Sequence, residues 1–345
     1  MEQNMKAFIV EKDGTYGIRE IPVPPYGEYE ALVKVVSCGV CNGTDMKIIH
    51  GKFKGIEDYP VVLGHEGVGE VVAIGAKVEN LKIGDRVLLP FIGTTPEGIY
   101  SAWGTYAEYN VVTDAGAMKR DGLEPEEFAL AQNKIPEDFD PVDAAMIITL
   151  REVYSTMGIF GFESGKSLAI LGLGPVGLSF VRLAKLKGMG PIVAMDIDDE
   201  KLALAKQLGA DFTLNTRGMD IPATVLECVP GGVDYALDAV GVPSFIGDGM
   251  AIVKPDAKVC VYGISEKMNA PLDWSKNPYN WTLQFNQFPQ KKLEGACHDQ
   301  IIAWIREGKL DPGFFVSHRI PFAEMGKAFE MIENREKMLK MVVVF

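Results

Sequence analysis

Residues suited to binding a divalent metal lie in two short, glycine-rich segments of the N-terminal third. Cys41 stands in CGVCNGTD, and His65 and Glu66 stand in GHEGVG. A thiolate and an imidazole are preferred zinc ligands, and a catalytic zinc site uses three protein ligands and leaves one position open for substrate. Taken singly, a cysteine is more often a small buried side chain and a histidine a structural one. The residue types make the two segments candidates for a metal site, but on these grounds alone the structural roles are favoured.

A third segment, SLAILGLGPVGLSFVRLAKLKG, has the pattern of a dinucleotide-binding turn. An apolar strand at 168–171 is followed by Gly172, Gly174 and Gly177, and a helix is expected to begin near Val176. The first glycine permits the tight turn, the second lets the backbone approach a pyrophosphate, and the third lets helix and strand pack closely. The alternative is an ordinary strand-to-helix turn.

The next expected strand, IVAM, ends in Asp196, at the distance from Gly177 that suits an adenosine ribose. A carboxylate there accepts hydrogen bonds from both ribose hydroxyls and repels a 2′-phosphate, so we expect NAD rather than NADP. No arginine follows Asp196 in IDDEK to bind such a phosphate. The alternative role for Asp196 is that of a helix cap. The predicted cofactor-binding residues are Gly172, Gly174, Pro175, Val176, Gly177 and Asp196.

The elements around the first two segments have the period of β-strands. Short alternating or β-branched runs predict strands in MKAFIV, EALVKVVS, GVGEVVAIG, DRVLLPF and TYAEYNVV, and a helix is expected at 141–160. From about residue 150, expected strands alternate with helical patterns such as DEKLALAKQLGA, which predicts a doubly wound parallel sheet. These later strands are placed at 192–195, 235–239, 258–262 and 292–295.

The chain is therefore expected to be an α/β protein with a mainly β catalytic domain at 1–150 and a Rossmann domain at 151–297. The segment 298–345 contains two helical patterns and ends in MVVVF, which could return to the first domain as a strand. A length of 345 residues suits two domains of ordinary size.

Composition excludes several classes of protein. The formal charge is −13 and no basic run is present, so a nucleic-acid partner is not expected. No segment has the sequence of a secretory signal peptide or a membrane span, so the cytoplasm is the default location. The five scattered cysteines make a poor disulfide framework and fit a reducing compartment.

The ordered motifs CGVCNGTD, VLGHEGVGEVVAIG, KIGDRV, GLGPVGL and MDID together resemble the zinc-containing medium-chain dehydrogenases, the family of alcohol, sorbitol and threonine dehydrogenases. The resemblance covers nearly the whole chain. It implies a GroES-like β domain, a Rossmann domain and a dimer or tetramer. It also implies that Cys41 and His65 bind the catalytic zinc, with Glu66 beside the metal as a ligand or an outer group.

The chain departs from the family pattern at three places. The lobe at 90–106 lacks the four cysteines of a structural zinc, so one zinc per chain is expected. The residue that hydrogen-bonds the substrate oxygen usually lies two positions after the ligand cysteine, whereas Thr44 lies three after Cys41. The position of the remaining zinc ligand is occupied by Ile148, which cannot bind metal.

Glu152, one helical turn beyond Ile148 on the same face, is the nearest carboxylate that could replace the missing ligand. It could equally pair with Arg151 or Lys185 at a domain surface. Glu66 is the other candidate, although two adjacent side chains are hard to aim at one ion. The predicted metal-binding residues are Cys41, His65, Glu66 and Glu152.

The implied reaction is hydride transfer between NAD and a small secondary alcohol, polyol or sugar. Zinc would act as a Lewis acid and Thr44 would pass on the alcohol proton. Lys47 occupies the place of a relay histidine in several relatives, and His50 is the alternative. Trp103, Phe91 and Trp281 are candidates to line the substrate pocket, although aromatic side chains are more often part of a core.

Two other functions compete with this interpretation. A zinc-free reductase of activated double bonds shares the fold, but it would lack the pair formed by Cys41 and His65. A dinucleotide-binding protein without catalysis is favoured only by Ile148 at the ligand position. Zinc content and NAD-linked activity would separate the three.

Overall fold

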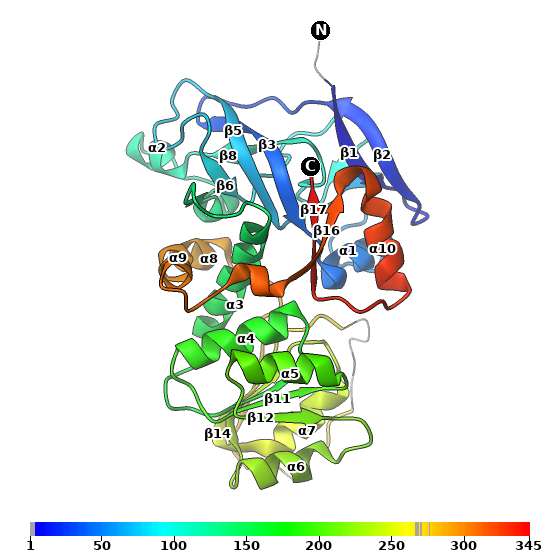
Figure 1. The fold of residues 1–345 in the computed structure, drawn as a ribbon, viewed down its shortest axis with the longest axis vertical. Coiled ribbons are helices and arrows are strands. Elements are labelled where there is room, and N and C mark those ends of the chain that lie inside the picture. The colour runs from blue at the N-terminus through cyan, green and yellow to red at the C-terminus, as the bar shows by residue number, and fades with distance from the viewer. Residues whose placement is uncertain (1–3, 266–268, 270, 276) are drawn as a thin grey trace. The chain divides into compact units, whose positions relative to one another are not determined.

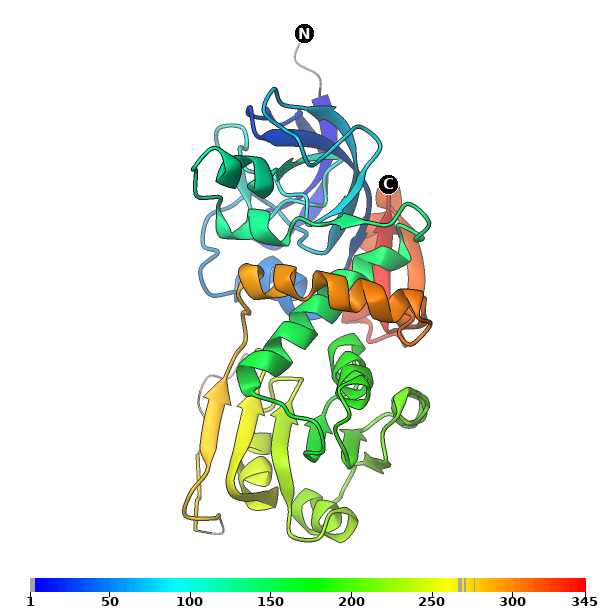
Figure 2. The ribbon, with the colours of Figure 1, turned by 90° about the vertical axis from the view of Figure 1, so that its left-hand side faces the viewer.

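The computed structural model describes residues 4–265, 269, 271–275 and 277–345 (Figures 1 and 2). They divide into one unit of Met1–Arg151 with Gln290–Phe345 and a second unit of Glu152–Pro289. The first boundary lies one residue beyond the predicted end of the β domain at 150, within helix α3 (Met146–Phe160). The chain returns to the first unit at Gln290, eight residues before the predicted boundary at 298.

The first unit is built on two sheets. One has the strand order β2-β1-β4-β7, and the other has the order β16-β17-β3-β5-β6-β9, with β8 also paired to β3. These strands are β1 (Asn4–Val10), β2 (Tyr16–Pro22), β3 (Glu30–Gly39), β4 (Val61–Val62), β5 (Gly67–Ile74), β6 (Arg86–Leu88), β7 (Tyr100–Ser101), β8 (Tyr109–Thr113), β9 (Lys134–Ile135), β16 (Val316–Pro321) and β17 (Lys340–Val344).

Strand β3 organises the second of these sheets. Its buried Ala31, Val33 and Val35 alternate with more exposed residues, which is the pattern of a strand with one face on a core. It pairs with β5 and β8, and β17 pairs with its end through Val343 and Cys38. The C-terminal strand thus pairs within the second sheet of the first unit.

The second unit contains a parallel six-stranded sheet in the order β12-β11-β10-β13-β14-β15. Strand order reverses at β10, since β11 and β13 flank it, and such a switch point opens a crevice at the carboxyl ends of the strands. The strands are β10 (Leu168–Leu171), β11 (Ile192–Asp196), β12 (Phe212–Asn215), β13 (Val233–Asp238), β14 (Val253–Val261) and β15 (Thr282–Phe285). The predicted doubly wound sheet is confirmed.

Helices alternate with these strands. They are α4 (Pro175–Leu186), α5 (Asp199–Leu208), α6 (Ile221–Cys228) and α7 (Ser244–Ile252). Helix α5 begins and ends as its sequence predicts. Asp198 accepts a hydrogen bond from the amide of Glu200, and Gly209 closes the helix with a left-handed backbone, φ 111°.

One predicted strand is wrong. Residues 292–295 lie in helix α8 (Lys291–Ala296), which returns to the first unit and packs on the 3₁₀-helix Glu127–Ala131. A β-carbon on Gly295 would collide with the carbonyl of Leu130, so this contact requires glycine. A short apolar run does not distinguish strand from helix, and here tertiary packing decided the outcome.

The remaining helices of the first unit are α1 (Asn42–Ile49), α2 (Ala115–Arg120), α9 (His298–Arg306) and α10 (Met325–Glu333), with 3₁₀-helices at Asp143–Ala145, Pro312–Phe315 and Phe322–Glu324. Among the described residues, no helix is both long and apolar enough to cross a membrane. All five cysteines are free thiols.

Candidate active site

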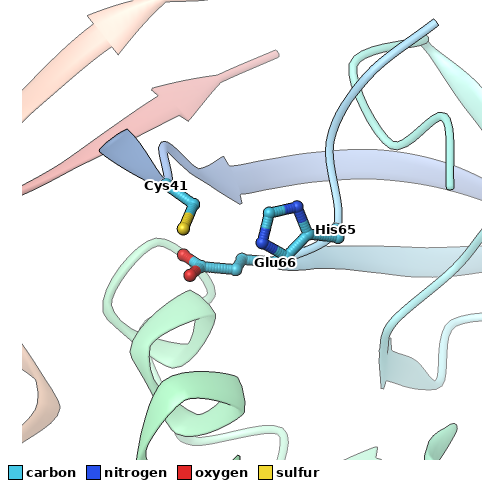
Figure 3. A group of neighbouring side chains, drawn as sticks. All are labelled: Cys41, His65 and Glu66. Atoms are coloured by element: carbon cyan, nitrogen blue, oxygen red, sulfur yellow. The ribbon is translucent and has the colours of Figure 1, made fainter. Parts of the chain in front are cut away.

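The ends of two neighbouring strands bring Cys41, His65 and Glu66 together. Cys41 follows β3 and precedes α1, whereas His65 and Glu66 precede β5, and β3 pairs with β5 through Cys38 and Gly67. One ligand atom from each of the three side chains lies within 4.8 Å of the others (Figure 3). The adjacent residues His65 and Glu66 thus both bring a ligand atom close to the thiol of Cys41.

The glycines around the group make this approach sterically feasible. A β-carbon on Gly39 would collide with the carboxylate of Glu66, and one on Gly67 would collide with the side chain of Thr105. The glycines in CGVC and GHEG thus leave room for Glu66 to lie beside the thiol and the imidazole (Figure 3).

Glu66 is buried and joined to the C-terminal strand. Lys340, the first residue of β17 and itself only 4% exposed, forms an ion pair with Glu66 Oε2. The hydroxyl of Thr149 in α3 donates to Oε1 at 3.4 Å. Burial alone would raise the pKa of Glu66, but the charges of Lys340 and His65 bring it below its ordinary value. Glu66 is therefore a carboxylate at neutral pH.

His65 stands between this group and a buried carboxylate. Its Nδ1 lies 3.7 Å from Asp45 Oδ1, while Asp45 Oδ2 accepts hydrogen bonds from the hydroxyl of Tyr106 at 2.6 Å and the amide of Cys41 at 3.0 Å. Burial lowers the pKa of His65, but Cys41, Asp45 and Glu66 outweigh it and raise the value to about 9. Asp45 thus holds the backbone of the metal-ligand candidate Cys41 through a hydrogen bond and places a carboxylate near the His65 ring.

The predicted proton-handling residues lie on or next to α1. Thr44 is half-buried in its first turn, and its amide bonds to the carbonyl of Cys41. Lys47 directs its ammonium to the carbonyl of Gly43 at 2.9 Å. His50 is exposed, 3.7 Å from a carboxylate oxygen of Glu333.

Of the three aromatic residues predicted to line a substrate pocket, Trp103 lies at the metal-ligand group. Its ring centroid is 5.0 Å from that of His65. Phe91 packs edge-on against Phe128, and Trp281 packs against the core of the second unit. Trp103 is therefore the aromatic wall of this group.

Ile148 and Glu152 have different surroundings on α3. Ile148 is buried, as expected of an isoleucine at that position. Glu152 is the first residue of the second unit and is not one of the three residues that form the metal-ligand group, so its role as a ligand stays a prediction. The bases expected as its alternative partners bond elsewhere: Arg151 to Asn133 and Lys185 to Asp211.

The glycine turn after β10 has the shape of a phosphate cradle. Gly172 has φ 94°, and a β-carbon there would collide with Val240. A β-carbon on Gly177 would collide with the carbonyl of Gly172, so helix and turn touch there. Gly174, in contrast, faces open space at the start of α4, where Pro175 and Val176 form the first turn. A pyrophosphate could approach the backbone at this opening.

Asp196 ends β11 beside this turn. Its Oδ2 accepts the amide of Leu173 at 2.7 Å, and its Oδ1 accepts the amides of Ile197 and Asp198 at 2.7 and 3.1 Å. The carboxylate is therefore held in one orientation at the rim of the turn. A helix-cap role is excluded, because Asp198 caps α5.

Four residues around the metal-ligand group were not predicted: Asp45, Tyr106, Thr149 and Lys340. A signal existed for two of them. Lys340 directly precedes the apolar run MVVVF, and Asp45 directly follows Thr44. A charged residue at the edge of a buried strand is expected to have a partner. The sequence does not identify Tyr106 or Thr149.

Two family models match the chain. Residues 27–122 match the alcohol dehydrogenase GroES-like domain, and residues 175–285 match the zinc-binding dehydrogenase. The NADP-dependent isopropanol dehydrogenase of Thermoanaerobacter brockii is 30% identical over 99% of both chains. Sorbitol dehydrogenase of Bacillus subtilis is 29% identical over 79% of this chain and 78% of its own. The structure of an alcohol dehydrogenase from Thermus sp. ATN1 matches 99% of both chains, with a TM-score of 0.79 and 25% identity.

Proposed function

This chain belongs to the zinc-containing medium-chain alcohol dehydrogenases, and on that premise we propose that it transfers a hydride between NAD and a small secondary alcohol, polyol or sugar with the help of one zinc ion. The single observation that carries the proposal is the approach of Cys41, His65 and Glu66 to within 4.8 Å of one another. A thiolate, an imidazole and a carboxylate form a donor set that suits zinc.

Cys41, His65 and Glu66 would hold the metal. A zinc ion held there supplies the Lewis acidity that makes an alcohol hydroxyl easier to deprotonate. Asp45 places a carboxylate 3.7 Å from Nδ1 of His65, and Lys340 keeps Glu66 ionised and oriented. We prefer Glu66 to Glu152 as the third ligand because the close approach of Glu66 to Cys41 and His65 supports it.

Thr44 would hold the substrate hydroxyl and take its proton towards solvent, through Lys47 or His50. Its place in the first turn of α1, with its amide bonded to the carbonyl of Cys41, supports this role despite the longer spacing. Trp103 would exclude water from one side of the reacting carbon and pack against the carbon skeleton of the substrate. The similarity to an isopropanol dehydrogenase and a sorbitol dehydrogenase supports a small secondary alcohol or a polyol as the substrate.

The glycine turn and Asp196 would bind NAD. The open space at Gly174 supports pyrophosphate binding there, and the fixed carboxylate of Asp196 supports recognition of an adenosine ribose without a 2′-phosphate. The relative from Thermoanaerobacter brockii is NADP-dependent, so this preference is a property proposed for the present chain.

We also propose that the chain forms a homodimer or homotetramer. Strand β15 is the last strand of its sheet, so it can pair with the same strand of a second copy about a two-fold axis. Phe285 and Phe288 are 55% and 58% exposed at its end, and Trp274 is 69% exposed nearby in the sequence. Such exposed aromatic residues support an interface.

The decisive experiment is elemental analysis of protein purified without chelator, together with an absorbance assay for NAD reduction across secondary alcohols, polyols and sugars. About one zinc per chain and NAD-linked turnover are expected. Two zinc ions per chain would contradict the single site. Absence of zinc together with reduction of activated double bonds would instead assign the chain to the zinc-free reductases.

A further inference from the structure

An arginine that is distant in the sequence lies beside the predicted ribose site. Nε of Arg217 donates a 2.9 Å hydrogen bond to the carbonyl of Ile197, the residue directly after Asp196. The segment IDDEK, which directly follows Asp196, contains no arginine. The loop after β12 supplies one from a later part of the chain.

This arginine is held in place by its own strand. β12 pairs with β11 through Asn215 and Asp196, and the amide of Thr216 donates to the carbonyl of Asp196 at 3.0 Å. The side chain of Asn215 accepts the amide of Arg217 at 3.1 Å and donates to Asp199 at 2.7 Å. Hydrogen bonds thus hold the turn that carries Arg217 against the loop after Asp196.

The guanidinium is nevertheless available to a ligand. Arg217 is exposed, and its two Nη atoms have no hydrogen-bond or ion-pair acceptor among the residues that the structure describes. Asp196 forms no ion pair with it among the described residues, since the carboxylate oxygens of Asp196 accept the backbone amides around the glycine turn. Asp198 caps α5 and Asp199 bonds to Asn215, so these two carboxylates are also engaged.

We propose that Arg217 is a specificity-determining residue, placed to bind the 2′-phosphate of NADP. Only the negative charge of Asp196, which repels that phosphate, prevents it from binding there. This inference rests on the proposed NAD site. Guanidinium groups bind phosphate through paired, charge-assisted hydrogen bonds, whereas a fixed carboxylate repels it. The cofactor preference of the chain is then a balance between two adjacent charges, and loss of the carboxylate suffices to admit NADP.

The test is a cycle of four proteins: wild type, Asp196→Ser, Arg217→Gln and the double variant. Binding of NAD and of NADP is measured by isothermal titration calorimetry, without any alcohol. We expect Asp196→Ser to bind NADP more tightly than wild type does. Arg217→Gln in that background should weaken NADP binding on the order of 10–100-fold, as expected for lost charge-assisted hydrogen bonds.

NAD provides the internal control, since it carries no 2′-phosphate. Arg217→Gln should change the Kd for NAD by less than about threefold, and Arg217→Lys in the Asp196→Ser background should retain part of the NADP affinity. Arg306→Gln, at an exposed arginine of the first unit, controls for the general loss of a positive charge.

Three results would overturn the inference: NADP affinity of Asp196→Ser that does not depend on Arg217, equal weakening of NAD and NADP by Arg217→Gln, or wild-type protein that already binds NADP more tightly than NAD. A wild-type protein that binds neither dinucleotide would instead refute the proposed function itself. A failure that leaves NAD binding intact therefore refutes only the role of Arg217.

Discussion

Glu66 has two different partners at the candidate active site. On one side are Cys41 and His65, and on the other is the ammonium of Lys340. A carboxylate buried beside a cation stays ionised, and an ionised carboxylate is what a metal ligand must be. Lys340 is therefore expected to act on the site through Glu66.

Glu66→Gln should lower zinc retention and kcat on the order of 10–100-fold, because an amide is a weaker ligand than a carboxylate. Glu152→Gln is the matched control, since it makes the same change at the competing carboxylate. Zinc per chain after dialysis and kcat are the measurements. Full zinc content in Glu66→Gln with loss in Glu152→Gln would reverse the two assignments.

Lys340→Met should destabilise the zinc-free protein by about 3–5 kcal/mol, because it leaves the buried carboxylate of Glu66 without its cation. The double variant Lys340→Met/Glu66→Gln should regain much of this loss, since no uncompensated charge remains. Urea unfolding of EDTA-treated proteins measures both. Equal stability of Lys340→Met and wild type would show that the ion pair contributes little to the fold.

At the scale of elements, helices α3 and α9 are joined by a buried polar network. Nη1 of Arg151 in α3 lies 3.4 Å from Nδ1 of His298 in α9 and donates to Asn133 at 2.6 Å. Nε2 of His298 lies 2.8 Å from the carbonyl of Lys134. This geometry requires a neutral ring that carries its proton on Nε2, because a proton on Nδ1 would face the guanidinium.

Burial and the charge of Arg151 lower the pKa of His298 to about 4, although the hydrogen bond with the carbonyl of Lys134 and the charge of Asp299 act in the opposite direction. An unfolded histidine has a pKa of about 6.5, so between these values only the unfolded chain binds the proton. The contribution of His298 to stability is therefore complete above about pH 7 and declines as the pH falls towards 4.

His298→Gln should remove this part of the pH dependence. The drop in unfolding free energy between pH 7.5 and pH 5 should be smaller in the variant by about 2 kcal/mol. Urea unfolding at the two pH values is the measurement, and His318→Gln, which alters a histidine in β16, is the control. The same pH dependence in His298→Gln and wild type would mean that His298 has an ordinary pKa.

At the scale of the whole molecule, the outer edge of β15 pairs with no further strand in the part of the chain that the structure describes, and we propose that a second copy covers it. An exposed strand edge with aromatic side chains around it is an aggregation risk unless another chain covers it. Pairing of identical edges about a two-fold axis closes the assembly and leaves no further edge.

Phe285→Asp combined with Phe288→Asp should shift the protein towards monomer, because two negative charges on each copy would face their counterparts across the axis. Light scattering after size-exclusion chromatography measures the mass. Tyr26→Asp, at an exposed aromatic residue of the first unit, should leave the mass unchanged. A wild-type monomer at micromolar concentration would contradict the proposed assembly.

The sequence by itself determined the features that depend on local physics. The glycine spacing of GLGPVG indicates a tight strand-to-helix turn that suits a dinucleotide, the periods of the segments separate a β unit from an α/β unit, and the apolar run MVVVF favours a buried strand. Those features predicted the fold and Asp196 beside the turn, whereas Cys41 and His65 were implied as ligands by the resemblance to the family.

Tertiary structure alone decided the partners that distant segments supply. Lys340 reaches Glu66 across 274 positions, and Arg217 reaches the carbonyl of Ile197 across 20, in each case because strand pairing brings two distant segments together. The helix at 291–296 differs from the predicted strand for the same reason, since its glycine fits against the backbone of Leu130. Local patterns predict which elements form, but only packing determines which charged side chains meet.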